Sequence, residues 1–278
     1  MDKKTKRKRS MKKKKRIDEL LVERELAEDI EKAKRAVMAG LVYSGEERID
    51  KPGSLLPVET PLRIKDKRLK YVGRGGYKLE KALQSFSVDV SDKIFMDIGS
   101  STGGFTDCAL KNGAKKCYAI DVGYNQLDWK LRNDPRVIEM ERTNFRHVTP
   151  DILTSGFPEV ASIDVSFISL KHIFPVLATL LNEKNDIIAL IKPQFEAFKD
   201  QVGAKGIVRD PSIHLEVLEK TVNYAADVSF TLVDLTYSPI KGTEGNIEFL
   251  AHFRWMNKEM PKDINLEQVV KDAQQALV

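Results

Sequence analysis

The strongest constraint on the fold is a series of apolar runs that recur every 20–25 residues through the middle of the chain. The runs are KIFMDIG (93–99), KKCYAIDV (115–122), VIEMERT (137–143), ASIDVSF (161–167) and DIIALIKP (186–193). Segments with helical periodicity, such as 169–183 and 211–227, fill most of the gaps between them. Alternating strands and helices predict an α/β fold, in which a parallel sheet is covered by helices on both faces.

The end of this region differs from the rest, because the runs 229–239 and 247–255 are separated by only a short loop. Two strands that lie so close in the sequence can form an antiparallel hairpin. We therefore expect the last two strands to run antiparallel to each other.

Positive charge is concentrated at the start of the chain. Residues 1–16 hold eleven basic residues and one Asp, a net charge of +10, whereas all 278 residues together carry +5. The remaining 262 residues therefore have a net charge of −5, the difference between those two values. A basic arm of this kind is attracted to polyanions. The alternative is a tail that only improves solubility.

The sequence before the apolar runs predicts a small separate domain. Helical periodicity indicates two short helices at 17–25 and 29–39, followed by a short strand at 41–43. The stretch 63–76 is charged and then rich in glycine, which is typical of a linker. We expect a basic disordered tail (1–15), a small α+β domain (16–66), a linker (67–76), a large α/β domain (77–256) and a C-terminal helical tail (257–278).

Cysteine content and hydropathy indicate a cytoplasmic protein. Cys108 and Cys117 are the only cysteines, and we expect them to be reduced, as small apolar residues of a helix and a strand. No apolar stretch approaches the roughly 18–20 residues that cross a bilayer. No apolar segment follows the basic start, as a secretory signal would require. The four histidines lack the spacing of metal ligands, so no metal is expected.

The segment DIGSSTGGF (97–105) follows the first run of the large domain and predicts a turn that approaches a ligand closely. A dinucleotide-binding turn would read G-x-G-x-x-G, but Ser101 stands at the position of its second glycine. Asp97 would repel a pyrophosphate and suit a cation, and Asp121 ends the next run, where it could bind ribose hydroxyls. This pattern favours S-adenosylmethionine, whose sulfonium and ammonium are positive, over a nucleotide or a purely structural turn.

Four charged residues lie in or beside the apolar runs, and three of them are expected near strand ends at the edge of the sheet where the turn lies. Lys78 precedes the first run, Asp164 lies inside ASIDVSFISL, Lys192 ends DIIALIKP and Glu248 lies in GNIEFLAHF. Charged groups in apolar strands are costly unless they are paired. Each has a structural explanation, since Lys192 and Glu248 could form a salt bridge and Asp164 could cap a strand end.

Taken together, the order Lys, Asp, Lys, Glu resembles the ribose 2′-O-methyltransferases of the FtsJ/RrmJ class. Residues 16–255 resemble the hemolysin-A-like (TlyA) family, which joins an S-four-type RNA-binding domain to such a methyltransferase. The resemblance rests on RIDELLVERELAEDIEKAKRAVMAGLVY, GRGGYKLEKAL, DIGSSTGGFTDCAL, YAIDVGYNQLDWKLRNDPRV, MERTNFRHV, IDVSFISL, IKPQFE and SPIKGTEGNIEFL. It implies a seven-stranded Rossmann-like methyltransferase sheet and, as substrate, a cytidine of 23S or 16S ribosomal RNA.

The resemblance also implies roles for individual residues. The four residues of the series Lys78, Asp164, Lys192 and Glu248 are the expected catalytic set. Cofactor-binding candidates are Asp97, Gly99, Ser100, Ser101, Thr102, Gly103, Gly104, Phe105, Asp121, Val122 and Asn144. RNA-binding candidates in the small domain are Arg16, Lys32, Lys34, Arg35 and Lys51.

The expected chemistry needs a base, because a ribose hydroxyl is a weak acid and a weak nucleophile. A free lysine is protonated at neutral pH, and a second lysine or partial burial disfavours its charged form. We therefore expect Lys192 to accept the proton with Lys78 beside it, although the two roles could be exchanged. Asp164 would orient the ammonium group, and Glu248 would position its partner or the ribose.

Three other functions compete with this interpretation. The historical name of the family suggests a pore-forming cytotoxic protein, but the sequence has no spanning segment and no long amphipathic hairpin. A catalytically inactive RNA-binding protein would be expected to lack one of the four charged residues, and all four are present. A methyltransferase for small molecules would not need the additional N-terminal domain.

Overall fold

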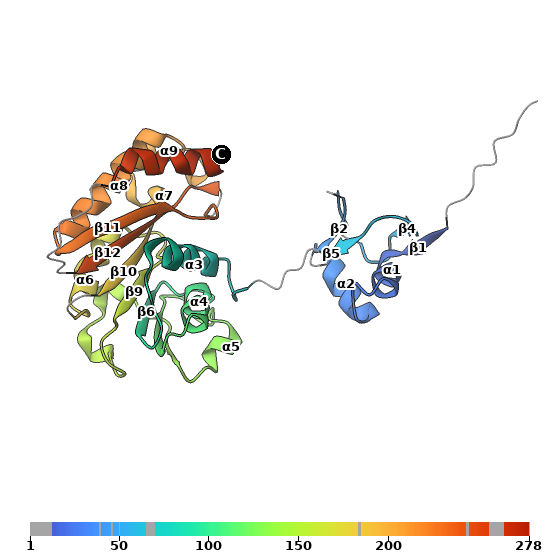
Figure 1. Cartoon of the computed structure of the whole chain (residues 1–278), viewed down its shortest axis with the longest axis horizontal. Helices are drawn as coiled ribbons and strands as arrows, with labels where there is room; N and C mark the ends of the chain where they lie inside the picture. Colours follow the sequence, from blue (N-terminus) through green and yellow to red (C-terminus); the bar gives the residue numbers. More distant parts are fainter. Residues whose placement is uncertain are drawn as a thin grey trace, which may run out of the picture. The chain divides into compact units, whose positions relative to one another are not determined.

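The computed structural model describes residues 13–38, 40–45, 47–49, 51–64, 70–182, 185–242, 245–255 and 264–277. The chain divides into two compact units, residues 1–69 and residues 70–278 (Figure 1). Most of the expected tail (1–15), the first part of the expected linker (67–76) and part of the expected C-terminal tail (257–278) lie outside the described residues. The side chain of Arg35 lies outside them as well.

The N-terminal unit has a small core of its own between two helices and short strands. Its elements are β1 (Lys14–Arg16), α1 (Ile17–Glu23), α2 (Ile30–Met38), β2 (Val42–Ser44), β3 (Glu47–Arg48), β4 (Leu55–Pro57) and β5 (Arg63–Ile64). β1 pairs with β4, and β2 lies between β3 and β5. Ile17, Leu21, Ala33, Val37 and Val42 form the core. Lys14 and Lys15, which the sequence assigned to the tail, are thus part of a strand.

The larger unit begins with α3 (Gly75–Phe86) and then alternates strands with helices. The strands are β6 (Ile94–Ile98), β7 (Lys116–Ile120), β8 (Val137–Met140), β9 (Val160–Ile163), β10 (Asp186–Ile191), β11 (Phe230–Tyr237) and β12 (Phe249–Trp255). The main helices are α4 (Gly104–Lys111), α5 (Trp129–Arg132), α6 (Phe174–Ala178), α7 (Pro193–Glu196), α8 (Pro211–Ala226) and α9 (Leu266–Leu277).

The seven strands form one sheet in the order β11-β12-β10-β9-β6-β7-β8. β6 to β10 run parallel, which confirms the α/β prediction. β12 is antiparallel to both β10 and β11, so the predicted hairpin is present, with β12 inserted between β11 and β10. Because the parallel strands end at one edge, the segments after β6, β7, β9 and β10 lie along that edge.

Helices cover the two faces of the sheet, as the nearly continuous apolar strands require. α3 and α4 pack against each other and cover one face (Figure 1). The other face is covered by α6, α8 and α9. Cys108 and Cys117 are buried free thiols of α4 and β7, which confirms the prediction that they are not paired.

One predicted helix is wrong. The sequence indicates a helix over 169–183, but the structure has a 3-10 turn, η3 (Leu170–His172), followed by the short α6. The reason is Pro175, which lacks a backbone N–H and is favoured only in the first turn of a helix. It therefore starts a new helix instead of continuing the preceding turn.

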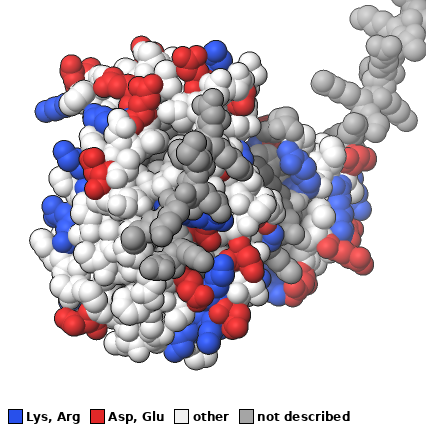
Figure 2. Space-filling view, turned by 60° about the vertical axis from the view of Figure 1, so that its left-hand side comes forward, with Lys and Arg blue, Asp and Glu red and all other residues white. Residues whose placement is uncertain are grey.

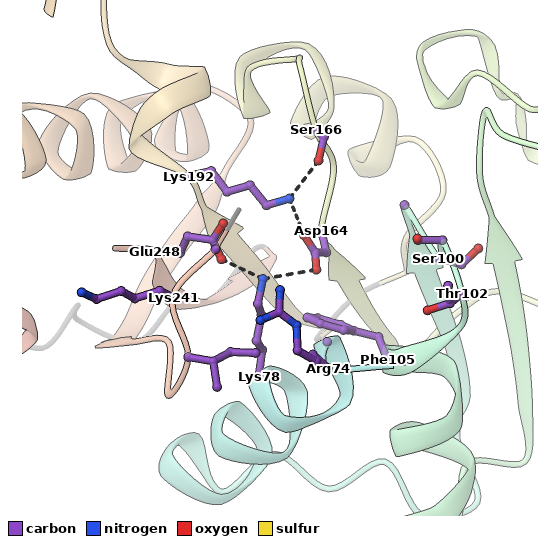
Figure 3. Close-up of a pocket in the computed structure, with 16 residues that line it drawn as sticks. Arg74, Lys78, Ser100, Thr102, Phe105, Asp164, Ser166, Lys192, Lys241 and Glu248 are labelled. Atoms are coloured by element: carbon purple, nitrogen blue, oxygen red, sulfur yellow. Dashed lines mark hydrogen bonds and ion pairs between the residues drawn. The ribbon is translucent and has the colours of Figure 1, made fainter. Parts of the chain in front are cut away.

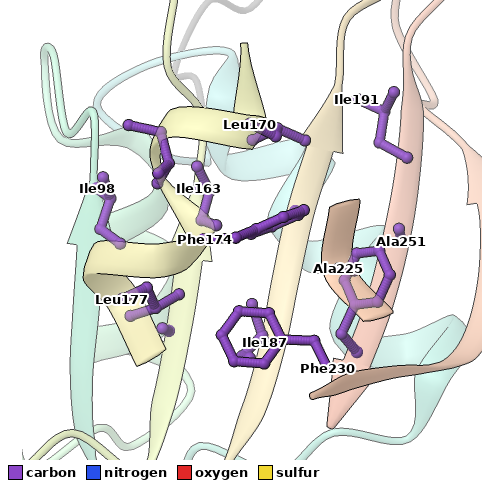
Figure 4. Packing of buried hydrophobic residues seen from close by; sticks show 14 of the residues in the cluster. Ile98, Ile163, Leu170, Phe174, Leu177, Ile187, Ile191, Ala225, Phe230 and Ala251 are labelled. Carbon is purple, nitrogen blue, oxygen red and sulfur yellow. The ribbon is translucent and has the colours of Figure 1, made fainter. Parts of the chain in front are cut away.

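Phe174 is central to the packing of this second face (Figure 4). It is 0% exposed, and its ring lies 5.6 Å from that of Phe230 and 5.5 Å from that of Phe253, both edge to face. Offset and edge-to-face aromatic pairs stabilise a core beyond the area they bury.

We expect Phe174→Ala to lower the free energy of unfolding by about 3–5 kcal/mol, because it leaves a cavity between two sheet strands and a helix. Denaturant unfolding measures the change as a lower midpoint with an unchanged slope. Phe157, which is 44% exposed, provides the matched control. Equal losses for Phe174→Ala and Phe157→Ala would contradict this view of the core.

Candidate active site

Two adjoining cavities open at the edge of the sheet where the parallel strands end. The smaller one, about 250 Å³, is lined by the first turn of α3, by the turn after β6, and by residues next to β9, β10 and β12. The larger one, about 540 Å³, is lined by the segments that follow β6, β7, β8 and β9. Gly99, Ser101, Asp164 and Ser166 line both cavities, so they form the shared wall.

The four charged residues of the predicted catalytic set meet in the smaller cavity (Figure 3). Lys192 Nζ lies 2.6 Å from Asp164 Oδ1, and Lys78 Nζ lies 3.8 Å from Asp164 Oδ2. Lys78 Nζ also donates a hydrogen bond of 2.7 Å to Glu248 Oε2. The charges thus alternate along a continuous chain from Lys192 to Glu248.

Burial makes this alternation necessary. Lys78 and Lys192 are each 8% exposed and Glu248 is 2% exposed, so none of the three can be solvated as a free ion. An unpaired charge at such a site would cost several kcal/mol, which each group avoids by facing an opposite charge. The set of two lysines and two carboxylates is therefore formally neutral.

These pairings differ from those suggested by the sequence. Lys192 and Glu248 do not pair with each other, because Lys192 pairs with Asp164 and Lys78 donates to Glu248. The sequence also placed the two ammonium groups side by side, whereas Asp164 contacts both and lies between them. Asp164 is thus a bridge between two elements and more than the cap of a strand end.

A glycine allows Glu248 to reach Lys78. A Cβ atom built on Gly242 would lie 2.1 Å from Glu248 Oε1, closer than any two such atoms can approach. A side chain at residue 242 would therefore push the Glu248 carboxylate out of its position beside Lys78.

Ser166 is a site residue that the sequence analysis missed. Its hydroxyl oxygen accepts a hydrogen bond of 3.2 Å from Lys192 Nζ. With Asp164 on one side and Ser166 on the other, the amine of Lys192 has two polar contacts that fix its direction. The signal for this residue was its place two positions after Asp164, in the segment that follows β9.

The glycine-rich turn after β6 forms the floor between the cavities. Gly99 has φ +88°, and a Cβ there would lie 2.5 Å from the backbone oxygen of Asp164. Both oxygens of Asp121 accept backbone hydrogen bonds, 2.8 Å from the N–H of Ser101 and 2.7 Å from that of Gly123. Asp121 thereby ties the turn after β6 to the turn after β7 and stands in the wall of the larger cavity.

Most of the predicted cofactor-binding residues lie along these cavities. Around the smaller cavity are Gly99, Ser100, Ser101, Thr102, Gly104 and Phe105. Around the larger cavity are Gly99, Ser101, Asp121, Val122 and Asn144. Asp97 and Gly103 line neither of the two.

Asp97 points into the protein and not toward a ligand. It is 0% exposed and accepts hydrogen bonds from the backbone N–H and the hydroxyl of Thr106, at 3.0 and 2.7 Å, and from the Ser162 hydroxyl at 3.2 Å. Burial, opposed in part by Thr106, raises the pKa of Asp97 to about 7. The carboxyl group therefore joins β6 to α4 and β9, and it does not supply the charge that the sequence analysis expected at the cofactor.

Three of the five predicted RNA-binding residues are engaged with acidic neighbours. Arg16 pairs with Asp18 at 2.6 Å and Lys34 pairs with Glu31 at 2.8 Å, while Lys32 pairs with Glu28. Lys51 is exposed. Basic and acidic side chains are interspersed over the face of the molecule shown in Figure 2.

The chain is similar to proteins of one family along most of its length. Residues 71–255 match the family described as FtsJ-like methyltransferase. YqxC of Bacillus subtilis (strain 168), a proposed rRNA methyltransferase, is 57% identical over 270 residues, which cover 95% of this chain and 96% of that protein. The 16S/23S rRNA (cytidine-2′-O)-methyltransferase TlyA of Mycobacterium tuberculosis is 38% identical over 256 residues, 90% of this chain and 92% of that one.

A solved structure from Streptococcus thermophilus, described as a proposed hemolysin, is similar in three dimensions as well. It is 50% identical, with a TM-score of 0.75, and the match covers 95% of this chain and 97% of that one. Among the described residues, no helix is both long and apolar enough to span a bilayer.

The raised pKa of Asp97 predicts a pH-dependent loss of stability. Between pH 4 and pH 7 the folded protein keeps a proton on Asp97 that the unfolded chain releases, so stability falls as the pH rises through this window. Asp97→Asn keeps the contact with Thr106 but cannot ionise. We expect the variant to gain about 1 kcal/mol relative to wild type for each pH unit in that range.

Unfolding free energies of both proteins at pH 5, 6 and 7.5 measure this difference. Asp121→Asn is the control for a carboxylate at the end of the neighbouring strand, because Asp121 is only partly buried. Parallel pH profiles for wild type and Asp97→Asn would show that Asp97 is ionised throughout.

Proposed function

The chain belongs to the FtsJ-like methyltransferase family, and on this premise we propose that it transfers a methyl group from S-adenosylmethionine to the ribose 2′-hydroxyl of a cytidine in ribosomal RNA. The observation that carries the proposal is the neutral chain Lys192–Asp164–Lys78–Glu248 in a cavity that shares a wall with a larger one. The names of the relatives support the substrate, because TlyA of Mycobacterium tuberculosis is an rRNA cytidine-2′-O-methyltransferase.

The larger cavity fits the cofactor in size and chemistry. It combines apolar walls from Ile120, Phe145 and Ile168 with the carboxylate of Asp121, as an adenosine with its ribose hydroxyls requires. The missing side chain of Gly99 lets the turn after β6 lie directly against the backbone of Asp164, so that both segments meet at the wall of this cavity. Bound there, S-adenosylmethionine would supply an electrophilic methyl group close to the shared wall.

The smaller cavity would hold the ribose, and a residue of its lining would remove the proton of the 2′-hydroxyl. Asp164 and Ser166 belong to the shared wall, so Lys192, which contacts both, is directed toward the junction of the cavities. We assign Lys192, once it has released its own proton to solvent and is a neutral amine, as the group that accepts the hydroxyl proton while the methyl–oxygen bond forms and the methyl–sulfur bond breaks. The alignment of oxygen, carbon and sulfur along this junction would supply the rest of the rate enhancement through orientation.

Lys78 is less suited to be the acceptor. Two carboxylates, Asp164 and Glu248, face its ammonium group, whereas Lys192 faces one carboxylate and a hydroxyl. Lys78 would instead keep Asp164 and Glu248 in place and present its charge to the ribose oxygens. Glu248 acts through Lys78 as a positioning residue.

We propose that the N-terminal unit adds RNA contacts that the larger unit lacks. Lys51 is exposed there, while Lys32 and Lys34 would exchange their surface ion pairs for phosphate contacts. Exposed pairs of this kind contribute only about 0–1 kcal/mol, so the exchange costs little. Arg16 would contact a phosphate while it keeps its pair with Asp18, which is 1% exposed. Phosphate contacts also make binding dependent on salt.

The name hemolysin suggests a second function, but no feature of the described structure favours it. The charged chain in the cavity has no use in a pore. Vesicle leakage by the purified full chain, in the absence of methyl transfer to RNA, would favour this alternative over ours.

We expect Lys192→Met to lower the rate of methyl transfer by about 100-fold to 10,000-fold, which is the range for loss of a general base. Methionine keeps the apolar stem but has no amine, and Asp164 remains paired with Lys78. Transfer of labelled methyl groups to rRNA from cells without the modification measures the rate. Calorimetry should give nearly unchanged binding of S-adenosylmethionine.

Lys115→Met is the control, because Lys115 is exposed just before β7, at the opposite edge of the sheet. A fully active Lys192→Met variant would refute the assignment of the base. Loss of cofactor binding in the same variant would instead place Lys192 in the cofactor site.

A further inference from the structure

Two cations at the smaller cavity are not used by the catalytic chain. The charges of Lys78, Asp164, Lys192 and Glu248 cancel, which leaves Arg74 and Lys241 as the other charged residues of its lining within the part of the chain that the structure describes. Both are exposed, and neither forms an ion pair with any residue that the structure describes. The mouth of a neutral cavity thus has two free positive charges, which suits an anionic substrate.

Lys241 also lines a third cavity, of about 290 Å³, together with Gly245 and Ile247 from the segment that precedes β12. Figure 3 shows its side chain extending away from Asp164 and Lys192. An anion held by Lys241 would therefore lie between the catalytic cavity and this third one.

The third cavity has the lining of a site for a flat, partly polar group. Ile207, Val208 and Ile247 supply apolar surface, and Arg209 adds an exposed cation. His214 is 0% exposed and donates from Nε2 to the backbone oxygen of Val208, at 3.0 Å. Its Nδ1 accepts from the amide of Gln274 at 3.3 Å, so the amide oxygen of Gln274 is left to accept a hydrogen bond from a ligand.

Hydrogen bonds join the walls of the third cavity to the segment that carries Glu248. Asn246 accepts a hydrogen bond of 3.0 Å from the N–H of Val208 and donates one of 2.9 Å to the backbone oxygen of Gly206. Because Asn246 lies two residues before Glu248, the third cavity and the catalytic cavity keep a fixed spacing.

We propose that the third cavity holds the nucleoside adjacent to the methylated one, with the phosphate between the two nucleosides on Lys241. The inference rests on the proposed function. In a nucleic acid strand a phosphate lies between successive nucleosides, which is the arrangement of Lys241 between its two cavities. Apolar walls with one amide acceptor suit a splayed base. The net charge of −5 after residue 16 makes such local cations necessary for RNA.

The test uses the full chain and an RNA fragment that spans the mapped methylation site. We expect Lys241→Gln to raise the KM for RNA about 3-fold to 10-fold with kcat within about 2-fold. We also expect it to lower the slope of the salt dependence of RNA binding by the contribution of about one phosphate contact. Affinity for S-adenosylmethionine, measured by calorimetry, should not change. Lys115→Gln, with the same loss of charge at the opposite edge of the sheet, should match wild type.

The base is tested by removing it from the nucleotide immediately 5′ or immediately 3′ of the target. One of these two abasic fragments should raise the KM of the wild-type protein. The same fragment should raise the KM of Gln274→Ala little further, because the missing base and the missing amide are the two partners of a single contact. Unchanged KM for both abasic fragments overturns the nucleoside site. A Lys241→Gln variant with the KM and salt dependence of wild type overturns the phosphate contact. A wild-type chain that methylates no RNA refutes the proposed function itself.

Discussion

The site depends on one carboxylate that holds two lysines. Asp164 follows β9 and Lys192 follows the adjacent β10. Lys78 comes from the first turn of α3, which covers one face of the sheet together with α4. Without Asp164, two buried ammonium groups would share one cavity with a single carboxylate, which low-dielectric surroundings penalise strongly. Its position fixes the direction of the Lys192 amine, which we propose receives the proton, and it also contributes to the wall behind which the methyl donor would lie.

The residues of the site could be predicted from the sequence better than their contacts. Parallel strands end at one edge, so charged residues at the ends of 161–167 and 186–193 had to lie near the turn 97–105. Which lysine meets which carboxylate depends on loops, and here on the absence of a side chain at Gly242. Ser166 and Lys241 were missed for the same reason, because a polar residue in a loop has no periodicity that reveals its direction.

Asp97 shows where reasoning from strand ends fails. A carboxylate near the end of a strand can face the ligand or the neighbouring helix. For Asp97 the position of Thr106 on α4 decides that it faces the helix. The predicted helix over 169–183 failed through a local effect, the missing N–H of Pro175. The sheet itself was predictable, because its strands are nearly continuous apolar runs, as expected for strands that are buried on both faces of a sheet.

The insertion of β12 between β10 and β11 determines when the site can first exist. Glu248 lies 170 residues after Lys78, its hydrogen-bond partner. During translation the elements that contribute Lys78, Asp164 and Lys192 emerge first, and the sheet has an open gap beside β10 until β12 is made. A nascent chain still lacking β12 therefore has a buried lysine with an incomplete set of counter-charges. The four charges of the site can therefore come together only after synthesis has passed that strand.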